Sequence, residues 1–113
     1  MILRYIATMA AIALFSGALQ ASAQDFGDPQ KGQAFARTVC AECHSVDARQ
    51  TLSPNRKAPA FAAVAKTSGM TAMALRTWLQ TSHPTMPNLV LKSEDRDNII
   101  AYILSLNNTS KGL

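Results

Sequence analysis

Cysteine is scarce in this sequence: the 113 residues include only Cys40 and Cys43, which share one C-x-x-C spacing. No further thiol is left for a disulfide with either of them, and no second cysteine pair exists. A structural zinc ion takes four ligands, whereas only His83 remains as a histidine besides His44. A dithiol redox centre normally lies beside a βαβ pattern, and the sequence has none.

Long apolar runs are also missing, apart from a short one at the beginning of the chain. This run follows a positive charge at Arg4, and the small residues at 21–23 fit the cleavage pattern of secretory signal peptides. Even counted to Leu19, it is shorter than the roughly 18 residues needed to span a bilayer. No cysteine follows the cleavage site, which argues against a lipid anchor. The sequence therefore predicts a signal peptide at 1–23 and one mature domain at 24–113.

Strand alternation, internal repeats and low-complexity segments are absent as well, and the remaining patterns are helical. Asp28 before Pro29 is a typical helix opening, since an N-cap oxygen precedes a ring that presets φ. Ser93 is expected to cap the last helix. The predicted helices cover residues 29–41, 59–67, 71–82 and 94–107. We therefore expect an all-α domain of about four helices.

The first predicted helix has one continuous face that ends at Cys40. Its members recur at helical spacing: Gly32, Phe35, Ala36, Val39 and Cys40. Glycine within a helix costs roughly 1 kcal/mol against alanine. Gly32 is therefore expected to permit the close approach of another helix.

The motif Cys40-Ala41-Glu42-Cys43-His44 has the C-x-x-C-H form of a haem-attachment site. On one helical turn, two thiols lie close enough to add across two vinyl groups of one porphyrin. The adjoining imidazole then reaches the iron from the same side. Cys40 and Cys43 are predicted to hold haem c covalently, and His44 is predicted to ligate its iron.

The second axial ligand decides whether the iron is open to small molecules. Met86 lies in a segment that two prolines keep from being helical, which suits a ligand brought over the far face of the ring. Met70 and Met73 stand at a helix start, where methionine is often core filler. Met86 is the predicted ligand, and His83 is the alternative.

Two further features each have two interpretations. Trp78 lies on the inner face of the helix predicted at 71–82, so it is either a core aromatic or an N–H donor to a haem propionate. Arg49, Arg56 and Lys57 share a loop with no acidic residue between them. They form either solvated surface or part of a docking patch.

With these motifs in place, the chain resembles a small class I cytochrome c of the bacterial periplasm over essentially all of its mature sequence. The resemblance rests on the C-x-x-C-H motif, Gly32 eight residues before Cys40, Pro59 with Phe61, Met86-Pro87, and the run from Ile99 to Ile103. It implies that the first and last helices cross at Gly32 and Tyr102. It also implies that the Pro59 carbonyl accepts the ring N–H of His44. The family usually has an aromatic residue where this chain has Ala36, and Phe35 stands one position earlier.

The resemblance implies a periplasmic single-electron carrier that is not an enzyme. Its expected partners are periplasmic or membrane-bound redox proteins, a dehydrogenase or an oxidase, which dock transiently with a monomer. Neither a nucleic-acid partner nor a membrane span after signal cleavage is expected. Loss of Arg4 lowers the net charge from +4 to +3, and two haem propionates would offset most of it, so attraction for acidic partners would come from local patches.

Two other functions remain as alternatives. One is a five-coordinate haem protein that binds or reduces a small ligand such as peroxide or nitric oxide, which a Met86 ligand would exclude. The other is a permanent subunit of a dehydrogenase or oxidase, which would need a larger exposed apolar patch.

Overall fold

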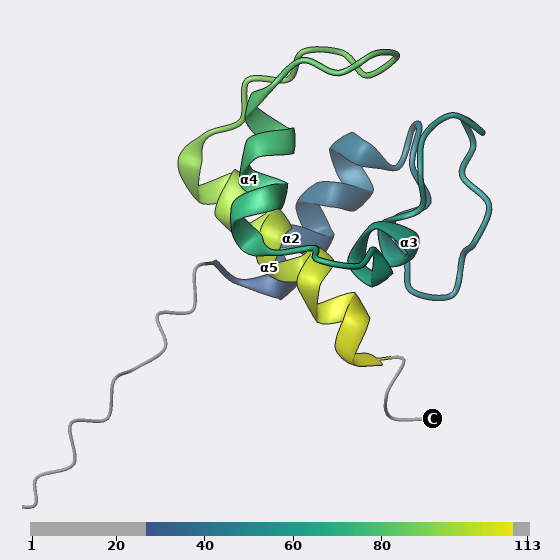
Figure 1. The fold of residues 1–113 in the computed structure, drawn as a ribbon, viewed down its shortest axis with the longest axis horizontal. Coiled ribbons are helices and arrows are strands. Elements are labelled where there is room, and N and C mark those ends of the chain that lie inside the picture. The colour runs from purple at the N-terminus through teal and green to yellow at the C-terminus, as the bar shows by residue number, and fades with distance from the viewer. Residues whose placement is uncertain (1–26, 110–113) are drawn as a thin grey trace, which may run out of the picture.

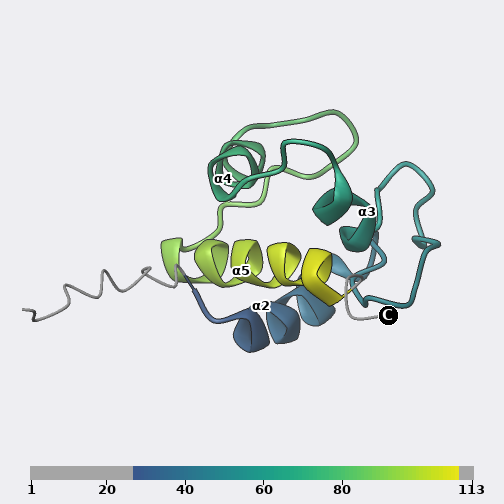
Figure 2. The ribbon, with the colours of Figure 1, turned by 60° about the horizontal axis from the view of Figure 1, so that its bottom comes forward.

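The last helix, α5 (Ser93–Thr109), is the element against which the other helices pack. The computed structural model describes residues 27–109. In it, α5 contacts α2 (Pro29–Phe35), α3 (Phe61–Lys66) and α4 (Ala72–Gln80). Figure 1 shows these helices, and Figure 2 shows α2 on one side of α5 with α3 and α4 on the other. Residues 27–109 contain no strand, which confirms the predicted all-α class; the predicted signal peptide lies outside the described residues.

The four predicted helices are confirmed with small shifts at their ends. α4 follows an N-cap at Thr71, whose hydroxyl accepts the amide of Ala74 at 3.1 Å. The expectation that Ser93 caps α5 is wrong, because the amide of Arg96 donates to the carbonyl of Lys92 at 3.0 Å. This hydrogen bond places Ser93 within the first turn of the helix. Within residues 27–109, no helix is long and apolar enough to cross a bilayer.

The first predicted helix is α-helical only in its first half. It continues as the π-helix η1 (Ala36–Cys40), in which the amide of Ala41 donates to the carbonyl of Ala36 at 2.9 Å. In a π-helix the bonded residues are five positions apart instead of four, and such turns are frequent at functional sites. The predicted helix over 29–41 is therefore confirmed through Cys40, but it is α-helical only as far as Phe35 and reaches the C-x-x-C-H motif as a π-helix.

The crossing of α2 and α5 requires glycine, as expected from the sequence. A Cβ added to Gly32 would lie 1.9 Å from the carbonyl oxygen of Asn98 and 2.9 Å from the Cβ of Tyr102. The side chain of Asn98, which is 6% exposed, accepts the amide of Asp28 at 2.7 Å. The Asp28 carboxylate in turn caps α2 through the amides of its first turn. Gly32 and Tyr102 thus lie at the helix crossing that the resemblance implies.

The hydrophobic core surrounds α5 and includes residues from η1, α3, α4 and the loop after the motif. Its buried members are Ala36, Val46, Phe61, Ala65, Leu75, Ile99, Ile100, Tyr102, Ile103 and Leu106. Ala36 is completely buried, so the position at which the family usually has an aromatic residue is filled here by a methyl group. Phe35 is only partly buried and packs against the edge of this core.

Trp78 does not belong to the core. Its side chain is 55% exposed, whereas Leu75, one turn earlier on α4, is 3% exposed. The interpretation of Trp78 as a core aromatic is therefore wrong. α4 has nine residues, and helical periodicity marks the face that turns inward without showing how far the packing extends along it.

Candidate functional site

The cysteine pair and His44 occupy a single turn at the end of η1. The carbonyl of Cys40 accepts the amides of Cys43 at 3.2 Å and His44 at 2.9 Å, so the three residues are held in one turn by the backbone. Both cysteines are free thiols and partly buried. Burial raises the pKa of the Cys40 thiol to about 11, so the unmodified sulfur is protonated at neutral pH. The donor set and its placement on one turn fit the attachment of a haem through two thioethers.

The imidazole of His44 is oriented by two neighbours from the beginning of α3. Its Nδ1 lies 2.7 Å from the carbonyl oxygen of Pro59. Because a carbonyl can only accept, Nδ1 carries the proton and Nε2 carries the free lone pair. The ring also lies against Phe61, with centroids 5.3 Å apart and planes tilted by 50°. This is the contact with Pro59 that the resemblance implies, and it leaves Nε2 available for a metal.

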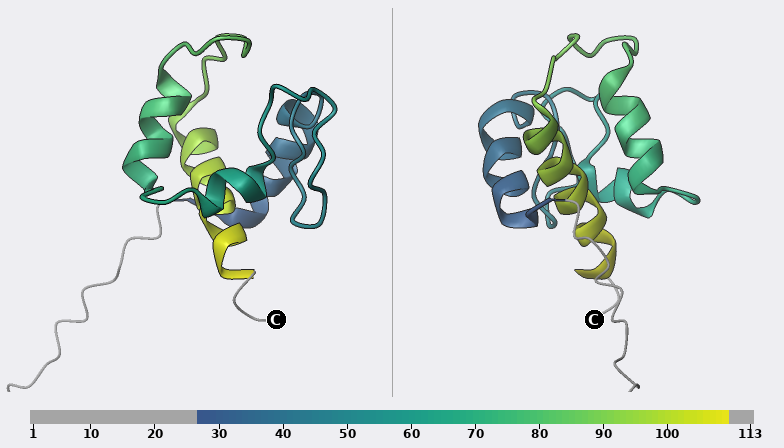
Figure 3. Two further views of the ribbon diagram at one scale, coloured as in Figure 1. Left: turned by 45° about the vertical axis from the view of Figure 1, so that its right-hand side comes forward. Right: turned by 90° about the vertical axis from the view of Figure 1, so that its left-hand side faces the viewer.

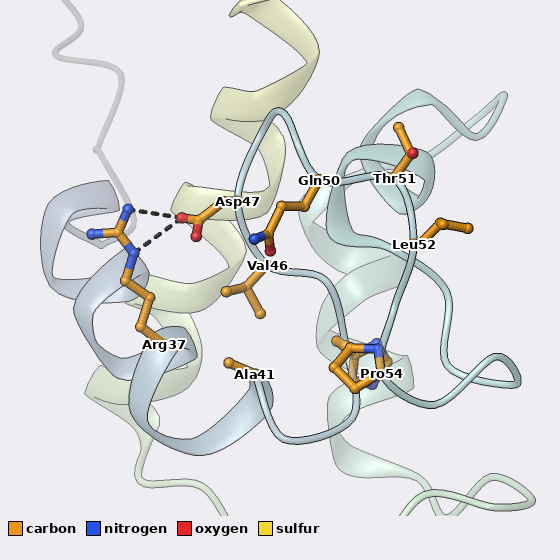
Figure 4. A pocket seen from close by; sticks show the side chains of 9 residues that line it. Arg37, Ala41, Val46, Asp47, Gln50, Thr51, Leu52 and Pro54 are labelled. Carbon is orange, nitrogen blue, oxygen red and sulfur yellow. Dashed lines mark hydrogen bonds and ion pairs between the residues drawn. The ribbon is translucent and has the colours of Figure 1, made fainter.

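A hollow of about 410 Å³ lies beside His44, between η1 and the loop that follows the motif (Figure 4). Arg37 closes one edge by donating to the Asp47 carboxylate through Nη2 at 2.8 Å and Nε at 3.0 Å. Tyr102 ties the same loop to α5, since its hydroxyl donates to the carbonyl of Val46 at 2.6 Å. Neither of the two cysteines lines this hollow, so it does not by itself describe a haem site.

Met86 and His83 lie in a separate loop that follows α4. Figure 1 and the left view of Figure 3 show this loop apart from the one that precedes α3. Met86 is partly buried and lines a small hollow together with His83 and Trp78. The Trp78 and His83 rings meet edge to face, with centroids 5.5 Å apart and planes at 85°. Nδ1 of His83 lies 3.1 Å from the carbonyl oxygen of Thr81.

The turn before Met86 has an unusual backbone. The amide of Met86 donates to the carbonyl of His83 at 3.4 Å, which closes a four-residue turn. Thr85, the third residue of this turn, has φ of 73°, in the left-handed region that disfavours β-branched side chains. Proline at the second position and positive φ at the third fit a type II turn, in which glycine is the preferred third residue.

The other methionines of the described chain differ in burial. Met70 is partly buried and packs against the core, as expected of a core filler. Met73 is 78% exposed, so the expectation of core packing is wrong for this residue. Its exposure makes Met73 a suitable control for substitutions of Met86.

The basic residues Arg49, Arg56 and Lys57 are all exposed. None of them forms an ion pair with another described residue. Within residues 27–109, no three histidine, cysteine or acidic side chains are grouped closely enough to hold a metal ion. A zinc site of that kind is therefore not found in this part of the chain.

Three features of this region were not predicted from the sequence. The first is the buried Ser45, whose role depends on loop residues with no periodic pattern. The second is the connection of Arg37 to Asp47 across the motif, which opposite charges ten residues apart could have suggested. The third is the π-helix, because an apolar pattern over only five residues does not distinguish a π-helical turn from an α-helical one.

A family model described as cytochrome c matches residues 29–107 of the chain. The match begins with α2, includes the C-x-x-C-H motif and the loop with Met86, and ends within α5. No curated protein and no solved structure matches the chain in the corresponding comparisons.

Proposed function

Because this chain belongs to the cytochrome c family, we propose that it is a periplasmic carrier that exchanges single electrons with other redox proteins. Proteins of this family bind covalent haem c with iron and generally serve electron transfer. When bound, the haem supplies one-electron exchange between Fe(III) and Fe(II). The protein itself attaches the group, sets the ligands of the iron and presents a surface to partners.

The observation that carries this proposal is the fixed imidazole of His44. We propose that Cys40 and Cys43 hold the haem as thioethers and that Nε2 of His44 ligates the iron. The hydrogen bond from Nδ1 to the Pro59 carbonyl, at 2.7 Å, supports this assignment because it holds the ring in one tautomer and raises its basicity. A ligand held in this way keeps one geometry in both oxidation states, which fast electron transfer requires.

We propose Met86 as the second axial ligand. Its partial burial and its position after a tight turn support a side chain that is already restricted before it binds iron. A thioether is a soft ligand that favours Fe(II), so it would raise the reduction potential. His83 remains the competing ligand, because its contact with the Thr81 carbonyl also leaves Nε2 free.

Trp78 is proposed as a donor to a haem propionate. Trp78 is 55% exposed and its indole N–H has no hydrogen-bond partner among residues 27–109, so it is available to an acceptor outside the protein. The proposed docking surface for acidic redox partners consists of Arg49, Arg56 and Lys57. Their exposure and lack of ion pairs support an electrostatic contact that is weak and transient.

The test is an absorption spectrum of the purified holoprotein, oxidised and reduced, compared with Met86→Ala and with Met73→Ala as the control. We expect a low-spin oxidised spectrum with a weak sulfur-to-iron charge-transfer band near the red end. This band should disappear in Met86→Ala, together with a lower reduction potential, and should persist in Met73→Ala. Covalent haem should remain in both variants, because neither residue attaches it.

Three results would contradict the ligand assignment. If the band persists in Met86→Ala, another residue supplies the sulfur. If the band is absent from the wild type and the spectrum is low-spin, His83→Ala should convert it to high-spin, and the ligand is His83. A high-spin wild type would mean that the iron has an open axial site. The protein would then bind small ligands at the iron, and the electron-carrier proposal would be wrong.

A further inference from the structure

Ser45, the residue directly after His44, is hydrogen-bonded to three residues in two other parts of the chain. It is 1% exposed, and each of its polar groups has a partner. Its amide donates to the hydroxyl of Ser53 at 2.9 Å, and its own hydroxyl donates to the carbonyl of Gln50 at 2.5 Å. Its carbonyl accepts the amide of Phe61 at 2.9 Å. A single small residue therefore holds both the loop after the motif and the start of α3.

The hydrogen bond from Phe61 to Ser45 and the one from His44 to Pro59 join the same two segments. The imidazole of His44 donates to the Pro59 carbonyl, while the amide of Phe61 donates in the opposite direction to Ser45. Residues 44–45 and 59–61 are thus joined by two neighbouring hydrogen bonds, and the Phe61 ring packs against the imidazole. The position of the Pro59 carbonyl relative to the imidazole consequently depends on where the backbone of Ser45 is held.

We propose that Ser45 is a positioning residue for the proximal iron ligand, and that its hydrogen bonds to Gln50 and Ser53 together keep the hydrogen bond from His44 to Pro59 aligned. This inference rests on the proposed function, in which His44 ligates haem iron. The hydroxyl acts by holding the loop through Gln50, so that the Ser45 backbone cannot move away from Phe61. A buried serine whose hydroxyl has one partner five residues further along the loop is well suited to this role.

The consequence for the iron has a definite direction. A well-aligned acceptor on Nδ1 raises the basicity of a ligating imidazole, which favours the more highly charged Fe(III). Removing the Ser45 hydroxyl leaves the Gln50 carbonyl without its donor and loosens the loop. The hydrogen bond from His44 to Pro59 then weakens and the imidazole donates less electron density to the iron. The reduction potential therefore rises.

The experiment compares the holoprotein with Ser45→Ala, Ser45→Thr and Ser105→Ala. Ser45→Ala should lower the preference of the His44 imidazole for Fe(III) over Fe(II) about threefold. For one electron, this corresponds to a rise of about 28 mV in the reduction potential. The paramagnetically shifted NMR signals of the His44 ring should move as well. Ser45→Thr keeps the hydroxyl and should restore both readouts toward the wild type.

Ser105→Ala is the matched control, because its hydroxyl also donates to a backbone carbonyl, that of Tyr102 at 2.6 Å within α5. It should lower stability without moving the potential. Denaturation midpoints are measured for every variant, so that a loss of stability alone is recognised.

An unchanged potential together with unchanged His44 signals in Ser45→Ala would overturn the inference, whatever its stability. If Ser45→Ala does not accumulate, Ser53→Ala decides, since it removes the acceptor of the Ser45 amide and leaves the Ser45 hydroxyl in place. It should raise the potential by a smaller amount, and no rise would overturn the inference. A wild type without covalent low-spin haem would instead refute the proposed function, which the absorption spectrum detects before any variant is made.

Discussion

The two loops that would provide the iron ligands are built differently. Residues 43–61 are held by contacts with distant parts of the chain, such as the hydroxyl of Tyr102 on the Val46 carbonyl at 2.6 Å. The hydrogen bonds of residues 81–92 within the described chain join residues no more than four apart. In this second loop, Val90 is 94% exposed. Long-range hydrogen bonds therefore hold the loop that contains His44, whereas the loop that contains Met86 has only local hydrogen bonds.

The largest effect that separates the two loops concerns the attachment of haem. Cys40→Ala combined with Cys43→Ala should abolish covalent haem completely, because these are the only thiols in the chain. Met86→Ala, the matched change in the other loop, should leave the covalent bonds intact. Haem staining after denaturing gel electrophoresis measures the difference. If the double variant still carried haem through denaturation, the attachment site would lie elsewhere.

A smaller effect should follow from loosening the first loop at Tyr102. Tyr102→Phe keeps the ring but leaves the buried carbonyl of Val46 without its donor, at a cost of about 1–2 kcal/mol. Chemical denaturation at neutral pH measures this loss. Thr38→Val is the control, because its exposed hydroxyl bonds only to Ala34 within the helix, and it should change stability by less than about 0.5 kcal/mol.

The same residue predicts a dependence on alkaline pH. Burial, with a further contribution from Asp47, raises the pKa of Tyr102 above its ordinary value of 10.0, while Gln33 and Arg37 act in the opposite direction. The folded state holds the Tyr102 proton more tightly than the unfolded state. The stabilisation is therefore complete below the pKa that Tyr102 has in the unfolded state, and it is lost as pH rises through the pKa that it has in the folded state. Stability should therefore fall above pH 10.0 more steeply in the wild type than in Tyr102→Phe. Equal slopes in the two proteins would contradict this role.

The comparison of loops also explains what the sequence could predict. Short-range signals specified the helices, the C-x-x-C-H turn and the glycine at the helix crossing, because each depends on spacing along one element. The contact of His44 with Pro59 was available only through the resemblance, since the two residues are fifteen positions apart in a loop without periodicity. Ser45 could not be singled out, because its importance comes from three partners in that same loop.

Trp78 shows the converse difficulty. The periodicity of α4 predicted an inward position, and Leu75 on the same face is indeed buried. Trp78 lies near the end of the helix, where the ring of His83 meets it edge to face and leaves more than half of the residue exposed. A periodic pattern describes the face of an element, but burial also requires a partner element, which the second loop does not supply.

The smallest effect should come from the turn before Met86. Thr85 adopts φ of 73°, a conformation that costs a β-branched residue about 1–2 kcal/mol in the folded state. Glycine adopts this conformation without that cost. Its more flexible unfolded state, however, lowers the free energy of unfolding by about 0.5–1 kcal/mol. Thr85→Gly should therefore raise the free energy of unfolding by about 0.5–1 kcal/mol, measured by chemical denaturation. Thr85→Ala, which keeps a Cβ at positive φ, should give no comparable gain. A destabilised Thr85→Gly would mean that the threonine side chain supports the loop, and the contrast between the two loops would then be smaller than the hydrogen bonds indicate.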